Sequence, residues 1–167
     1  MSEETGQTPT PTTAFLYDRT THPELYDQIL SKRILAFVID AIVIVLLMIP
    51  AALLVLVLGV FTLGLGWLLF PPLFAIVALA YYGLTLGGPR SASPGMRAAG
   101  IEMRTWNGQR LFAVLAIMHA LVFWVSVTLL TPLVLLVALF TERRQLLHDL
   151  LLGVMALNTE PLDRLGK

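Results

Sequence analysis

The stretch RILAFVIDAIVIVLLMIPAALLVLVL, residues 33–58, decides the fold class of this chain. After Arg33 it contains a single charged residue, Asp40, in an otherwise apolar run. As a helix, the 25 residues from Ile34 to Leu58 would extend for about 37 Å, more than the hydrocarbon core of a bilayer at about 30 Å. The stretch therefore predicts a tilted transmembrane helix.

Two further apolar blocks follow this stretch. The linker before the first of them, GVFTLGLG (59–66), is short and Gly-rich and predicts a tight helical hairpin. Residues 67–86 carry no charge, with Trp67 at one end and Tyr81–Tyr82 near the other, as expected of aromatic anchors at two interfaces. Residues 111–140 also carry no charge, but they are too long for one straight span and too short for two. They are predicted to form either one kinked helix or a re-entrant hairpin. The predicted fold is an all-α membrane protein, a bundle of about three transmembrane helices.

The composition agrees with a membrane protein and excludes several other classes. Only 13% of the residues are charged and 57% are hydrophobic, whereas soluble domains carry about 25% charged residues. The formal net charge of zero gives no general attraction to nucleic acid. The chain has no cysteine, which excludes disulfides and thiolate chemistry. We recognise no phosphate loop, nucleophile–base pair or metal-ligand cluster, so we expect no enzyme activity, cofactor or metal.

The basic residues predict the orientation in the membrane. Lys32 and Arg33 precede the first block, the 59–66 linker has no Lys or Arg, and the 87–110 loop has four arginines. The positive-inside rule then places the N-terminus and the 87–110 loop in the cytoplasm, as in a multi-pass protein of the cytoplasmic (inner) membrane. Arg143 and Arg144 also reach the cytoplasm if residues 111–140 re-enter or double back, and we favour that arrangement.

The remaining segments suggest a short tail at each end and a small cytoplasmic element. Residues 1–22 lack apolar periodicity and a signal peptide, so we expect a disordered tail before a transmembrane domain at 23–158, with a second tail at 159–167. IEMRTWNGQR (101–110) alternates around a turn signal, and GVMALN (153–158) resembles a strand. These two segments either pair as a small sheet or form irregular loop and interfacial helix.

Arg33, Asp40 and Asp149 are the candidate site residues. Arg33 and Asp40 are about two helical turns apart and share one face of the first predicted helix. Asp149 lies in RRQLLHDLLLG, directly after His148. A second histidine, His119, lies in the third block, either in a proton relay or hydrogen-bonded to a neighbour. Gly83 and Gly87 match the small-xxx-small pattern of close helix contacts.

At these residues the chain resembles the RDD family of small bacterial membrane proteins, named for one arginine and two aspartates. Arg33 opens the first helix, Asp40 lies within it, and Asp149 follows a basic run in a His-Asp context. SPGMRAAGIEM (93–103) looks like the family's central loop, with Gly95-Met96 where the family often has Gly-Lys. The resemblance covers about residues 25–158.

Two functions remain open on this basis. The resemblance implies a link to cation–proton exchange, in which Asp40 and Asp149 would be the exchangeable carboxylates for monovalent cations or protons. We expect such transport to require a homo-oligomer. Alternatively, the protein is a non-transporting scaffold or accessory subunit in the lipid bilayer. In that case Arg33 bridges Asp40 and Asp149 in a structural polar clamp.

Overall fold

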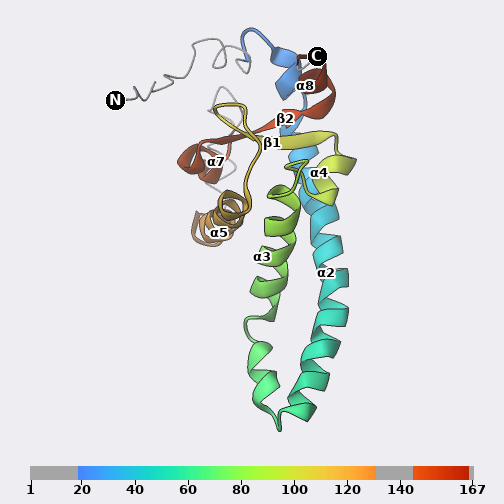
Figure 1. The fold of residues 1–167 in the computed structure, drawn as a ribbon. Coiled ribbons are helices and arrows are strands. Elements are labelled where there is room, and N and C mark those ends of the chain that lie inside the picture. The colour runs from blue at the N-terminus through green and yellow to red at the C-terminus, as the bar shows by residue number, and fades with distance from the viewer. Residues whose placement is uncertain (1–18, 131–144, 166–167) are drawn as a thin grey trace, which may run out of the picture.

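The chain folds into a long helical hairpin that projects from a smaller head (Figure 1). The computed structural model describes residues 19–130 and 145–165. The hairpin consists of α2 (Ile29–Phe61), η2 (Leu65–Leu69) and α3 (Leu73–Leu86). The head consists of η1 (Pro23–Tyr26), α4 (Pro94–Ala98), β1 (Ile101–Thr105), α7 (Leu147–Leu152), β2 (Val154–Asn158) and α8 (Thr159–Leu165). Helix α5 (Ala113–Leu130) lies beside α3 and α7.

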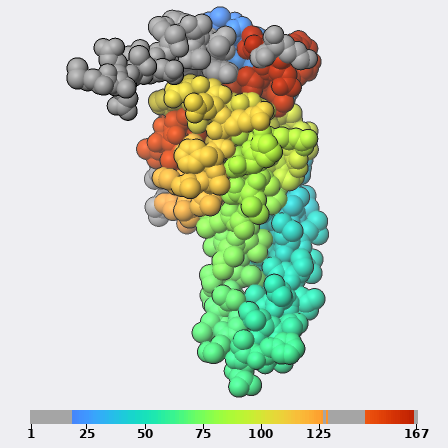
Figure 2. Space-filling view, in the orientation of Figure 1, coloured from blue at the N-terminus to red at the C-terminus, as the bar shows by residue number. Residues whose placement is uncertain are grey.

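Helix α2 confirms the first predicted helix and extends it at both ends. Within the described residues it is the one helix long and apolar enough to cross a membrane, and only 11% of its most apolar window is buried. Leu54 is 68% exposed and Phe61 is 83% exposed. The core helix of a soluble protein would be covered by other elements, whereas lipid can cover this surface. Figure 2 shows the hairpin extending well beyond the head.

The second predicted helix is interrupted. Residues 67–86 divide into η2 and α3 on either side of Phe70, Pro71 and Pro72. Because a proline has no backbone N–H, this pair interrupts the helical hydrogen bonds. Helix α3 is therefore shorter than predicted and begins at Leu73.

The hairpin turns tightly at residues 62–64, as predicted for the Gly-rich linker. Gly64 has a φ of 99°, a conformation that favours glycine. An added Cβ at Gly59 would lie 1.8 Å from Nε1 of Trp67, so this ring packs directly on the helix backbone. The Nε1–H of Trp67 also donates a hydrogen bond of 3.3 Å to the Leu56 carbonyl, so this side chain joins η2 to α2 near the tip of the hairpin.

Helix α5 packs on α3 through the two glycines of the small-xxx-small pattern. A Cβ added at Gly87 would lie 2.4 Å from Cα of Ala113, and one at Gly83 would lie 2.8 Å from Cγ1 of Ile117. The predicted close contact is confirmed. Helix α5 is seen nearly end-on in Figure 1, so it crosses the hairpin instead of running along it. Whether residues 111–140 cross once or re-enter depends on residues 131–144, which lie outside the described residues.

Replacing Gly87 with leucine should separate α3 from α5. The backbone of Ala113 cannot move aside as a flexible side chain could, so we expect a loss of about 1–3 kcal/mol of stability. Thermal unfolding in detergent measures this effect. Leu84→Phe is the matched control, because Leu84 lies on the same helix and is 79% exposed. Equal melting temperatures for the two variants would contradict the contact.

The head contains the small sheet that was one of the two predicted alternatives. Strands β1 and β2 pair antiparallel, from Ile101 opposite Asn158 to Thr105 opposite Val154. Ile101 and Val154 are fully buried. The segment predicted as a C-terminal tail forms α8, whose Leu162 packs with residues of η1 and β2. These contacts join the C-terminal helix to η1, near the start of the described residues.

The head also sets the level of Asp40 along α2. Helix α4 packs against α2 around Ala36 and Asp40. Beyond this point, the uncharged residues 41–61 extend for about 31 Å, enough to span a bilayer core by themselves. Asp40 therefore lies where the head meets the hairpin and not at the middle of the apolar span.

Candidate functional site

Arg33 and Asp149 form an ion pair between α2 and α7. Nη1 of Arg33 lies 2.5 Å from Oδ2 of Asp149, and the Asp149 side chain is fully buried. The same oxygen accepts a hydrogen bond of 3.0 Å from the backbone N–H of Leu146 at the start of α7. A buried pair with this extra donor joins the first helix of the hairpin to the C-terminal part of the head.

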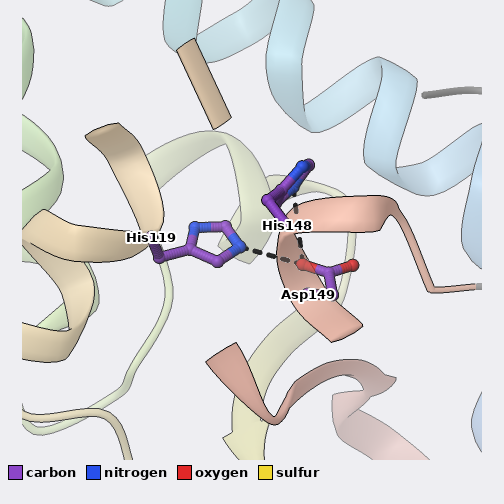
Figure 3. A group of neighbouring side chains, drawn as sticks. All are labelled: His119, His148 and Asp149. Carbon is purple, nitrogen blue, oxygen red and sulfur yellow. Dashed lines mark hydrogen bonds and ion pairs between the residues drawn. The ribbon is translucent and has the colours of Figure 1, made fainter. Parts of the chain in front are cut away.

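Two histidines face the other oxygen of the same carboxylate. Nε2 of His119 lies 2.9 Å from Oδ1 of Asp149, and Nε2 of His148 lies 3.5 Å from it. Figure 3 shows His119 reaching from α5 toward α7, which carries His148 and Asp149. The two imidazole rings meet edge to face, with centroids 4.9 Å apart. His119 is thus hydrogen-bonded to a neighbouring side chain, the simpler of its two predicted roles.

Burial and neighbouring charges determine the protonation states of Asp149 and His148 on α7. Burial alone would raise the pKa of Asp149, but the Arg33 charge and the His119 hydrogen bond outweigh it and hold that pKa below its usual range. Burial lowers the pKa of His148 to about 3. At neutral pH, Asp149 is therefore charged and the His148 ring is neutral.

Asp40 has three donors of its own. Its Oδ1 accepts from the Tyr81 hydroxyl at 2.6 Å and from the Gly95 backbone N–H at 2.8 Å. Its Oδ2 accepts from the Ser93 hydroxyl at 2.5 Å. The Asp40 residue is only 2% exposed. These bonds tie α2 to α3 and to α4, whose N-terminus is capped by Ser93.

Gly95 is required by this geometry. A Cβ at this position would lie 2.2 Å from the Ala36 carbonyl oxygen and 2.7 Å from Oδ1 of Asp40. No larger residue fits without moving α4 away from α2. The glycine of the Gly95-Met96 pair therefore allows its own N–H to reach the carboxylate.

The expectation that Arg33 bridges both carboxylates is confirmed for Asp149 and wrong for Asp40. Among the described residues, Arg33 pairs with Asp149, and no ion pair joins it to Asp40. The physical reason is that Tyr81, Ser93 and Gly95 already surround Asp40. Arg33, Asp40 and Asp149 therefore form two separate polar centres, each with one residue of α2, and not one bridge.

Sequence analysis did not identify the partners of Asp40 or the grouping of the histidines. Tyr81 was interpreted as an interfacial aromatic, and Ser93 and Gly95 only as part of a family loop. No metal-ligand cluster was recognised, because His119 and Asp149 are 30 positions apart. The fold brings His119, His148 and Asp149 together, with one ligand atom from each all within 4.8 Å of one another.

Comparison with known proteins agrees with the family resemblance. The sequence profile described as the RDD family matches residues 29–153, which include Arg33, Asp40 and Asp149. No curated protein and no solved structure is significantly similar to the chain.

Proposed function

Because this chain belongs to the RDD family, we propose that it is a non-transporting membrane scaffold or accessory subunit held together by a polar clamp. We use the name polar clamp for Arg33, Asp40 and Asp149 with the donors that contact the two carboxylates. The observation that carries the proposal is that donors of the protein itself occupy all four carboxylate oxygens.

This occupancy favours a structural role over exchange. A carboxylate that exchanges cations or protons needs free lone pairs and a path to water. Asp40 is 2% exposed and Asp149 is 0% exposed, and each accepts at least three close contacts. A buried carboxylate with this many donors is bound to its neighbours through hydrogen bonds that a cation would have to displace.

The position of the polar clamp also suits a scaffold. Asp40 connects α2 to α3 and α4, while Asp149 connects α7 to α2 and, through His119, to α5. Five helices thus meet at two carboxylates at the boundary between head and hairpin. The clamp would fix the head rigidly at the membrane surface, where it can present its polar face to a partner.

Flux measurements separate the scaffold from a cation–proton exchanger. The purified protein is reconstituted into liposomes with a pH-sensitive dye and exposed to gradients of Na⁺, K⁺ or Li⁺. We expect no cation-driven proton flux above that of empty liposomes, and we expect Asp40→Asn to lower the detergent melting temperature. Wild-type flux that a folded Asp40→Asn variant has lost would establish exchange and overturn the scaffold.

The orientation is a separate expectation: the head faces the cytoplasm and the hairpin tip the opposite side. Single introduced cysteines can test this orientation, because the chain has no cysteine of its own that a thiol reagent could label. Cysteine replaces Leu63 at the tip, where the side chain is 97% exposed, or the exposed Asn107 in the head. An impermeant thiol reagent on intact cells should label the first variant only. Labelling of the second alone would reverse the topology.

A further inference from the structure

We propose that His119, His148 and Asp149 form a binding site for a divalent transition metal of the zinc class. The three side chains offer two imidazole nitrogens and one carboxylate oxygen, all within 4.8 Å of one another. All three residues are buried, with exposed fractions of 6%, 1% and 0%. Two histidines and one carboxylate are a ligand set that zinc and related metals use in proteins.

The two distances from Asp149 to the histidines are close to those in a tetrahedral metal site. Bonds of about 2.0–2.1 Å to each ligand place neighbouring ligand atoms about 3.3 Å apart. Oδ1 of Asp149 lies 2.9 Å from Nε2 of His119 and 3.5 Å from Nε2 of His148, on either side of that value. The two histidine nitrogens lie within 4.8 Å of each other, so the imidazole rings must turn toward one another to bind one ion.

The two oxygens of Asp149 have separate tasks in this arrangement. Oδ2 faces Arg33 and the Leu146 N–H, whereas Oδ1 faces only the two histidines among its described contacts. The first oxygen orients the carboxylate, as in sites where outer contacts fix a ligating group. The second oxygen accepts from His119, and metal binding exchanges this hydrogen bond for bonds from both atoms to the same ion. The Arg33 charge opposes a second cation, so only a metal with strong bonds to imidazole should bind, and Mg²⁺ should not.

The surroundings of His148 also support a metal site. The polar clamp does not use this residue: its Nε2 is at the outer limit of a hydrogen bond, and its buried Nδ1 has no partner in the described part of the chain. Buried polar groups without partners are uncommon and costly. Its ring nevertheless packs edge to face against His119 and Phe123, which holds Nε2 toward Asp149.

His148→Phe is the decisive variant. Phenylalanine keeps the ring and its packing but removes both nitrogens, so the metal-free protein should keep its melting temperature. The full-length protein in detergent is stripped with a chelator and then given Zn²⁺ or Mg²⁺. We expect Zn²⁺ alone to raise the melting temperature of the wild type, with about one Zn²⁺ retained per chain. In His148→Phe, the affinity for Zn²⁺ should fall by at least about 100-fold.

His22→Phe is the matched control, because His22 lies in the head and contacts the exposed Glu24. It should retain the full Zn²⁺ response.

Co²⁺ gives a readout that needs no variant: a tetrahedral site should produce visible ligand-field bands in the wild type. The proposal is overturned if the wild type shows no Zn²⁺-dependent stabilisation and no Co²⁺ bands, or if His148→Phe binds Zn²⁺ as the wild type does. Neither result depends on the flux assay, so the metal site and the scaffold can fail separately.

Discussion

Replacing Arg33 with alanine should destabilise the protein by about 3–5 kcal/mol. The substitution leaves the Asp149 carboxylate in a fully buried position without its counter-charge. The hydrogen bonds from His119 and Leu146 remain, but neither brings a guanidinium charge. The carboxyl group must then either stay charged at high cost or take up a proton and lose the contacts made by its charged form.

Thermal unfolding of the purified protein in detergent measures this loss. Arg90→Ala is the control, because Arg90 is exposed and forms no ion pair with the described residues. We expect a large fall in melting temperature for Arg33→Ala and a small change for the control. Similar melting temperatures for the two variants would show that the ion pair does not hold the fold.

Asp40→Ala should have the second large effect. It leaves the Tyr81 hydroxyl, the Ser93 hydroxyl and the Gly95 N–H without their acceptor at the junction of three helices. Each buried donor left unsatisfied costs about 1–3 kcal/mol, so the total loss should be about 3 kcal/mol or more.

Asp40→Asn and Asp163→Ala complete this comparison. The amide oxygen of asparagine can still accept from Gly95 and Tyr81, so this variant should be less destabilised than Asp40→Ala. Asp163 is an exposed carboxylate on α8, and its removal should change the melting temperature little. If Asp40→Ala were no less stable than Asp163→Ala, the donors around Asp40 would not stabilise the fold.

The parts of the fold that depend on local chemistry were predictable. The apolar run after Arg33 predicted α2, and the glycines at 59–66 predicted the tight turn. The alternation around Asn107-Gly108 and in 153–158 offered the sheet as one of two alternatives. Gly83 and Gly87 indicated a close helix contact, and the structure shows that the partner is α5. Each of these signals lies within one segment of the chain.

The partners of the polar groups were not predictable from local signals. Arg33 and Asp40 share a face of α2, which suggested one bridge, but α4 packs on α2 at Asp40. Ser93 and Gly95 reach Asp40 only because α4 packs on α2. The grouping of His119 with α7 likewise depends on how α5 crosses the hairpin, which no spacing in the sequence specifies.

A double-mutant cycle on Arg33 and Asp149 tests the polar clamp most directly. The stability of Arg33→Ala, Asp149→Asn and the double variant is compared with that of the wild type by unfolding in detergent. Since the two side chains are in direct contact, removing both charges should cost less than the two single losses added, with a coupling of about 2 kcal/mol or more. Losses that add within about 0.5 kcal/mol would show that the two residues act independently, and would contradict the clamp.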